Sequence, residues 1–168
     1  MSQTVRLTKG HVFRLYQLVR SKFLTLSTQD AGVKTIYKVA KLHDILKSEA
    51  ETIRKAISAI NVMLAEYENE RQRICTKYAK RDENGNPITE AGQYVIEDKE
   101  AFEKEIKQLK ERYKDQLESA KKANEELDQL LEEEIELAVP KIELSELPDK
   151  VQLTTLEFEL LLPIVQEE

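Results

Sequence analysis

The chain has 168 residues, of which 35% are charged and only 6% aromatic, with no Trp and four each of Gly and Pro. This composition argues against a broad globular core and favours long helices, which tolerate few helix-breaking residues. A single cysteine, Cys75, excludes an intrachain disulfide, and no stretch approaches the roughly 18 apolar residues of a membrane span, so we expect a soluble, cytoplasmic protein.

The net charge of -6 conceals a strong polarity along the chain. Residues 1–48 hold nine Lys or Arg against two acids, a net of +7, whereas residues 125–168 hold fourteen acids against two Lys, a net of -12. A basic first third is one feature of nucleic-acid-binding proteins. Here it is not interleaved with the aromatic or Gly-rich patterns that stack bases. The distribution therefore favours contact between the two ends, within one chain or between neighbouring copies.

Residues 1–32 are predicted to form a strand followed by a short helix. The stretch VRLTKGHVFRLYQLV runs V-x-L-T into an amphipathic segment, and Thr8 is suited to cap its helix. Val5 and Leu7 of the strand and Phe13 of the helix are candidates for contact with a partner.

Residues 33–80 are predicted to form one long helix. Apolar residues recur at alternating spacings of three and four, the pattern of a heptad seam. Because no Pro or Gly interrupts the run, we expect about 45 helical residues spanning roughly 70 Å. His43 lies on this seam, where a polar residue commonly sets the register. The seam positions are Ile36, Val39, His43, Leu46, Ala50, Ile53, Ile57, Ile60, Leu64, Tyr67, Arg71, Ile74 and Tyr78.

The segment 81–97 is predicted to form the tip of a helical hairpin. Asn84-Gly85 is a strong turn signal because both residues tolerate a positive φ, and Pro87 forces an extended conformation on the residue before it. The following PITEAGQYVIED alternates as a short strand does, with Gly92 as a second turn point. We expect a small β-hairpin or ordered loop with Asn84, Gly85, Pro87, Gly92 and Tyr94 as its characteristic residues.

A second long helix is predicted over 98–133, with Asp98 as its N-cap. Two apolar stripes joined by a turn should pack antiparallel, because neither buries its stripe alone. Facing residue numbers then sum to about 180. The expected pairs are Tyr78 with Phe102, Tyr67 with Tyr113, and Ile60 with Ala120. The second stripe consists of Phe102, Ile106, Leu109, Tyr113, Gln116, Ala120, Ala123, Leu127 and Leu130.

The last segment, 134–168, is predicted to hold one or more strands and a short C-terminal helix. EIELAVPKIELSEL alternates but is interrupted at Pro140, which is typical of an edge or bulged strand. VQLTTLEFELLLPIV repeats the V-x-L-T pattern, with an extended piece at 151–153 and Thr154 as the cap. Strands from both ends can form a small sheet with exposed edges, and such edges commonly pair with another copy. Further candidate contact residues are Ile135, Leu137, Ile142, Leu144, Val151, Leu153, Phe158 and Leu161.

The predicted fold class is therefore mainly α. It is a long antiparallel helical hairpin, or coiled coil, with a small β element at the tip and a small sheet plus short helices formed by the two termini. We treat residues 1–168 as a single domain.

The residues that usually carry chemistry are few and scattered. His11 and His43 are far apart in sequence and have no nearby Cys, which argues against a metal site. Cys75 has no His near it in sequence and is interpreted as a packing residue. The four glutamates between 132 and 136 point in different directions around a helix or strand. With no phosphate-binding Gly loop and no hydrolase or metalloprotease motif, we predict no catalytic residues, no metal and no cofactor.

Two stretches resemble a known group of proteins. KYAKRDENGNPITEAGQYVIEDKEAFEKEIKQL, followed by LLEEEIELAVPKIELSELPDKVQLTTLEFELLLPIVQEE, is similar to uncharacterised small helical-hairpin proteins of tailed bacteriophages and prophages. The likeness covers residues 65–168 and extends to the first third in pattern only. It departs from the family at Thr154-Thr155, where such proteins often have a Ser-Pro cap, and at 117–131, which is more helical. The resemblance implies a phage-encoded protein in the cytoplasm of the bacterial host, and the family has no catalytic residues to transfer.

Three functions are compatible with the sequence. The first is a non-enzymatic phage accessory protein that assembles into a homo-oligomer, such as a ring, and binds another phage or host protein. It would act in virion assembly, in host modulation or as a structure sensed by bacterial immunity. The second is a prefoldin-like chaperone that holds unfolded clients, and the third is a helical nucleic-acid-binding protein, which predicts a steep loss of affinity with salt.

Overall fold

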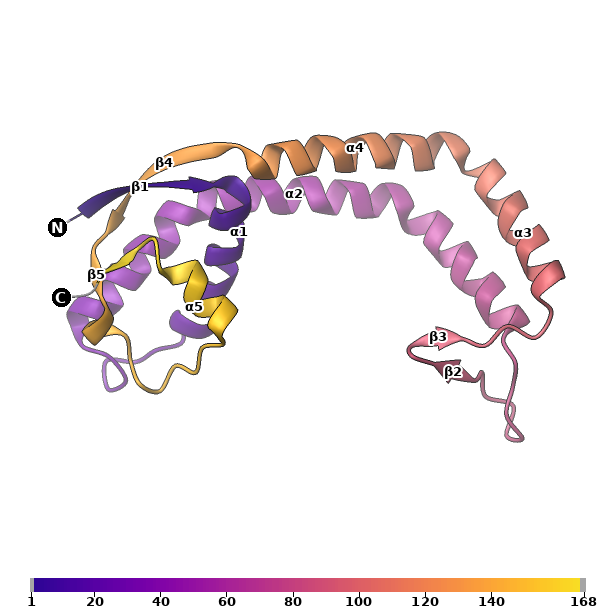
Figure 1. Ribbon diagram of the computed structural model, residues 1–168, viewed down its shortest axis with the longest axis horizontal. Helices are drawn as coiled ribbons and strands as arrows, with labels where there is room; N and C mark the ends of the chain where they lie inside the picture. Colours follow the sequence, from indigo (N-terminus) through magenta and orange to yellow (C-terminus); the bar gives the residue numbers. More distant parts are fainter. Residues whose placement is uncertain (1, 167–168) are drawn as a thin grey trace. The chain divides into compact units, whose positions relative to one another are not determined.

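The computed structural model describes residues 2–166 and is mainly helical, with small β elements (Figure 1). The chain divides into two compact units, Met1–Ala56 with Glu126–Glu168 (unit 1) and Ile57–Glu125 (unit 2). That both form a single domain stays a prediction. Within residues 2–166, no helix is both long and apolar enough to cross a membrane.

The long helix α2 spans Val33–Tyr78, 46 residues, as the unbroken heptad pattern predicts. None of its thirteen predicted seam positions is exposed, whereas most of the residues between them are. The first part of α2 belongs to unit 1 and the second part to unit 2.

Unit 1 contains a two-stranded antiparallel ribbon built from the two ends of the chain. Strand β1 (Ser2–Thr8) pairs with β4 (Glu134–Pro140) (Figure 1). In their register Val5 lies opposite Leu137. Odd-numbered residues of both strands are buried or half-buried, while even-numbered ones through Ala138 are exposed except Thr8. This period of two places one face of the ribbon on the core, and the predicted pairing of strands from both ends is confirmed.

The two predicted threonine caps are both present. Helix α1 (Lys9–Leu18) begins after Thr8, whose hydroxyl accepts the backbone N–H of His11 at 3.1 Å. Helix α5 (Thr155–Leu161) begins after Thr154, which forms a reciprocal capping box with Glu157. Each cap satisfies a backbone donor that the first helical turn leaves without a partner.

The remaining elements of unit 1 differ from the sequence-based expectation. Residues 151–153 form no strand. Instead, β5 (Ile142–Glu143) pairs in parallel with β6 (Val165–Gln166), which follows α5. A π-helical turn (Val19–Phe23) extends α1, and a 3-10 turn (Leu144–Glu146) follows β5. The parallel pair adds a second, minimal β contact between sequence-distant segments.

The core of unit 1 is formed where α1, the first part of α2, β4 and α5 meet. Its largest fully buried side chains are Val12, Leu15, Val19, Leu42, Leu46, Val139 and Ile164. These residues come from both ends of the sequence, so the core itself holds the two ends together.

The predicted single helix over 98–133, most of which lies in unit 2, is divided in two. Helix α3 (Lys99–Arg112) is capped by Asp98, whose carboxylate accepts the N–H of Ala101 at 3.0 Å, and α4 spans Lys114–Glu132. Tyr113, between them, has a non-helical ψ of 15°. Helical hydrogen bonds continue on both sides of Tyr113, to Leu109 at 3.1 Å and from Leu117 at 2.9 Å. The interruption is thus a local break in the helix.

This break changes which residues face the core of unit 2. Gln116, predicted on the stripe, is exposed, and Leu117 packs against the buried cluster of Tyr67, Ile74 and Leu109 instead. Along the apolar stripe, the residues Leu109, Tyr113 and Leu117 are each four positions apart, whereas the predicted stripe has a spacing of three after Tyr113. The polar side chain is thereby kept in solvent.

Two of the three predicted pairs across unit 2 are confirmed by aromatic contacts. Tyr67 and Tyr113 meet edge to face with ring centroids 5.8 Å apart, and Tyr78 and Phe102 do so at 6.1 Å. In both pairs the two residue numbers sum to 180, so within this unit α2 packs antiparallel to the helices that follow the tip. The pairing of Ile60 with Ala120 stays a prediction.

The tip of unit 2 is a small β structure, as expected. Strands β2 (Thr89–Glu90) and β3 (Gln93–Tyr94) pair around Ala91 and Gly92, which have φ values of 48° and 79°. The hairpin turn is therefore at the second predicted turn point. Mirror-image turns of this kind need positive φ at both central positions.

Candidate functional site

Three of the predicted contact residues are part of the interior. Leu7, Ile142 and Leu161 are buried in the core of unit 1 and expose almost no side-chain surface to a partner. Their role in contacts between copies is therefore not supported. The sequence patterns identified them as apolar residues of the ends, but could not distinguish a core face from an interface.

The other predicted residues near the ends mostly support the same core. Leu144 is exposed at 43%, and Phe158 is half-buried. The half-buried residues packed against the core cluster are Val5, Phe13, Ile135, Leu137, Val151 and Leu153. What remains available for contact on the ribbon is its backbone edges.

The direction of the ribbon's backbone groups follows from one hydrogen bond at its end. The N–H of Lys9 donates to the carbonyl of Glu133 at 2.8 Å, in the register that pairs Leu7 with Ile135. Antiparallel pairs alternate between hydrogen-bonded and non-hydrogen-bonded types. The odd-numbered residues of β1 therefore bond to β4, and the even-numbered ones direct their N–H and C=O groups away from it. Within residues 2–166, β1 and β4 have no other strand neighbour.

Pro140 agrees with this assignment. It lies opposite Ser2, a pair of even-numbered residues, so its missing N–H falls on the open side of β4. Proline within a sheet is tolerated at such edge positions because no ladder hydrogen bond is lost. The sequence-based interpretation of Pro140 as an edge residue is therefore consistent with the structure.

The exposed face of the ribbon is charged. Arg6 Nη2 lies 2.7 Å from Glu136 Oε1, and Arg6 Nε lies 4.0 Å from Glu134. Next to the ribbon, Lys9 donates to Glu133 at 2.8 Å, and this hydrogen bond raises the pKa of Lys9. The acids belong to β4 and its approach, and the bases to β1 and α1. Opposite charges thus lie on the two strands.

Further ion pairs join the basic and acidic ends within unit 1. Lys22 lies 2.7 Å from Glu157, and Lys150 lies 2.8 Å from Asp30. Hydrogen bonds from Lys22 and from the Thr154 N–H lower the pKa of Glu157. Among the described residues, five of the nine basic residues in 1–48 are paired with acids of the acidic region 125–168, namely Arg6, Lys9, Lys22, Lys34 and Lys38. Much of the charge polarity is therefore neutralised within one chain.

Across unit 2, polar contacts accompany the aromatic pairs. The Tyr113 hydroxyl donates to Glu70 at 2.7 Å, which lowers the pKa of Glu70 and raises that of Tyr113. Lys77 lies 2.7 Å from Glu105, and Arg112 lies 2.7 Å from Glu70. The predicted register is thus held by both apolar and polar contacts.

The predicted tip residues lie in two adjoining turns. The Asp82 carboxylate accepts the N–H groups of Asn84 and Asn86 at 2.9 and 2.8 Å, and these bonds lower its pKa. Gly85 has a φ of 81°, and Pro87 forms an isolated bridge with Arg81. The tip is therefore an ordered structure held by its own hydrogen bonds.

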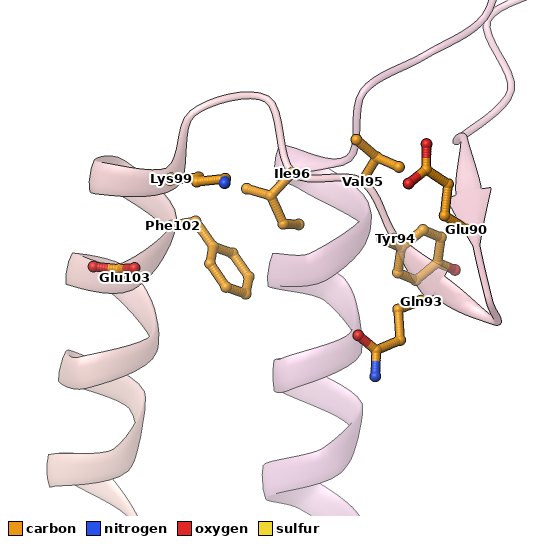
Figure 2. A pocket seen from close by; sticks show the side chains of 8 residues that line it. All are labelled: Glu90, Gln93, Tyr94, Val95, Ile96, Lys99, Phe102 and Glu103. Atoms are coloured by element: carbon orange, nitrogen blue, oxygen red, sulfur yellow. The ribbon is translucent and has the colours of Figure 1, made fainter.

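An open hollow of about 480 Å³ lies beside this tip. Figure 2 shows Phe102 of α3 and Ile96 directed into the space between α3 and α2, whereas Tyr94 on β3 lies on the other side of α2 in this view. The Tyr94 hydroxyl accepts a hydrogen bond from Gln72 at 2.9 Å. The hollow is lined by Glu90, Gln93, Tyr94, Val95, Ile96, Lys99, Phe102 and Glu103. Sequence reasoning identified Tyr94 as a tip residue but not the hollow.

The residues that most often carry chemistry make packing contacts. His11 Nε2 lies 2.9 Å from the carbonyl oxygen of Leu160, His43 stacks on Tyr16 with centroids 5.0 Å apart, and Cys75 is buried. Over the described part of the chain, no three His, Cys, Asp or Glu side chains gather as a metal site. Comparison with family models, curated proteins and solved structures gives no match. The ribbon edges and the tip hollow are accordingly the candidate sites.

Proposed function

We propose that this chain is a non-enzymatic accessory protein that assembles into a homo-oligomer through the open edges of the β1–β4 ribbon. It acts through protein–protein contacts and has the form of a long helical hairpin. The observation that carries the proposal is the two-stranded ribbon itself, whose outer backbone groups have no strand neighbour within residues 2–166. Unpaired strand edges are templates for pairing with another chain.

The biological setting follows from the resemblance of residues 65–168 to helical-hairpin proteins of tailed bacteriophages. We propose a phage-encoded protein in the cytoplasm of the bacterial host, with another phage or host protein as partner. Its contribution would be to virion assembly, to host modulation or to recognition by bacterial immunity. Purification of the tagged protein from infected cells would identify the partner.

The assembly is tested at Thr4, whose side chain is exposed and whose N–H points to the open edge of β1. Thr4→Pro removes that donor without removing a bond to β4, so we expect loss of the oligomer with the fold retained. Thr4→Val is the matched control, because it keeps the N–H. Light scattering coupled to gel filtration gives the mass, and circular dichroism checks the helix content. A wild-type monomer at micromolar concentration would refute the proposal.

The hollow at the tip favours a second candidate, a prefoldin-like holdase. Phe102, Ile96 and Val95 present apolar surface in an open hollow, which is the property required to hold an unfolded client. The test is whether the protein suppresses aggregation of a denatured enzyme, and whether Phe102→Ala reduces the effect. No suppression by the wild type at equimolar ratio excludes this function.

A further inference from the structure

We infer that assembly is head to tail, with the open edge of β1 pairing antiparallel with the open edge of β4 in a second copy. This inference rests on the proposed self-assembly and names its contact. The charges of the two strands differ in sign, so each open edge is matched to the opposite edge of a second copy.

The charges nearest each open edge belong to exposed residues whose backbone groups point outward. On β1 the only such charge is Arg6, with Ser2 and Thr4 as its neutral neighbours; on β4 they are Glu134 and Glu136. The side chains of Arg6 and Glu136 are 65% and 60% exposed, so both can reach a neighbouring strand. Each strand therefore presents a single sign of charge.

Three edge pairings are possible, and charge discriminates between them. Pairing β1 with β1 brings two Arg6 side chains to the same contact and supplies no acid. Pairing β4 with β4 brings four carboxylates together. Like charges across a strand pair destabilise it, whereas opposite charges stabilise it. Only the pairing of β1 with the partner's β4 brings Arg6 next to glutamates of the second copy.

The β1–β4 register within one chain indicates the register of the contact between two chains. Arg6 lies directly opposite Glu136 in the β1–β4 ladder. If the same antiparallel offset repeats across the new contact, Arg6 lies between its own Glu136 and Glu136 of the partner subunit. Opposite charges then alternate across the extended sheet.

The symmetry of the assembly follows from this contact. The open edges of β1 and β4 lie on opposite sides of the ribbon, so a β1–β4 contact leaves one free edge on each copy. Such heterologous contacts form closed rings or open filaments, whereas a contact of like edges ends at a dimer. We therefore expect more than two copies.

Charge reversal on the two strands tests the inference. In Arg6→Glu both edges are acidic, and in Glu136→Arg the β1 edge stays basic while the β4 edge loses its net negative charge. Each variant alone should lose at least tenfold in assembly affinity, and mixing the two should restore the assembly because their edges are complementary. The double variant Arg6→Glu/Glu136→Arg restores the pair within each chain as well as between chains. It therefore controls for destabilisation of the ribbon. Light scattering gives the mass, and circular dichroism confirms folding.

The outcomes separate this inference from the proposed function. If the wild type is monomeric, self-assembly fails and the inference fails with it. If the wild type assembles and only one of the single variants is impaired, the contact does not need both charged strands, so the inference fails while self-assembly stands. If neither is impaired, or if neither the mixture nor the double variant recovers, the contact lies elsewhere. Impairment of both single variants with recovery in the mixture and in the double variant supports the head-to-tail contact.

Discussion

Gly10 shows how closely α1 approaches the end of α4 in unit 1. A Cβ at this position would lie 3.1 Å from the backbone oxygen of Leu131 and 3.4 Å from its Cβ. Gly→Ala in a helix ordinarily stabilises by up to about 1 kcal/mol. Here we expect Gly10→Ala to destabilise by roughly 1–2 kcal/mol, because a backbone atom must move. Urea denaturation measures the change, and Gly32→Ala is the matched control because nothing lies within 4 Å of its Cβ. An unchanged or raised stability of Gly10→Ala would contradict the packing.

Asp30 is expected to make folding pH-dependent in the acid range. Hydrogen bonds from Lys150 and from the backbone and hydroxyl of Ser27 lower the pKa of Asp30 to about 2, from 3.8. Because the folded state binds the proton less readily, the stabilisation is present above pH 3.8 and is lost as the pH falls towards 2. Asp30→Asn should therefore be less stable than wild type at neutral pH, with the gap closing below about pH 4.

The measurement for Asp30 is the midpoint of thermal unfolding from pH 2 to 7. Asp149→Asn serves as the control, since Asp149 is exposed and precedes Lys150 in the sequence. A gap between wild type and Asp30→Asn that stays constant over this range would show that the carboxylate contributes through shape alone.

The break at Tyr113 determines which face of α4 is apolar. Leu117 packs against the cluster of Tyr67, Ile74 and Leu109, while Gln116 is exposed. We expect Leu117→Ala to destabilise by roughly 1–3 kcal/mol through lost burial, and Gln116→Ala to change stability by less than about 0.5 kcal/mol. Chemical denaturation of the two variants compares them directly. If the two variants lost the same amount of stability, the result would favour the apolar stripe predicted from the sequence, in which Gln116 faces the opposing helix.

How far the elements could be predicted depends on whether their cause is local. The length of α2 follows from the absence of Gly and Pro, and the caps at Thr8, Asp98 and Thr154 satisfy donors next to them in sequence. Local signals also located the turn at Gly92. The break at Tyr113 was not predictable, because spacings of three and four are interchangeable until the opposing helix is known.

The candidate site was predicted only in part, for the same reason. The V-x-L-T pattern and the alternation at 134–147 predicted strands at both ends that can form a small sheet, but the burial of Leu7, Ile142 and Leu161 depends on the helices that cover them. The parallel pair β5–β6 consists of two residues in each strand, too few for any periodic signal. The tip hollow arises from residues on β2, β3 and α3 together.

At the scale of the whole molecule, the two units are expected to differ in stability. Counted over the part of the chain that the structure describes, unit 1 has a core of fifteen buried residues, whereas the cluster in unit 2 contains three. Regions with little buried apolar surface open by partial unfolding at a lower free energy than the global transition. We expect the amide of Leu109 in unit 2 to exchange through an opening of lower free energy than that of Leu46 in unit 1. Hydrogen exchange at increasing denaturant measures both. In Leu109→Ala the opening of unit 2 should become easier while the amide of Leu46 is unaffected, and a parallel change at both amides would show that the chain unfolds as one cooperative unit.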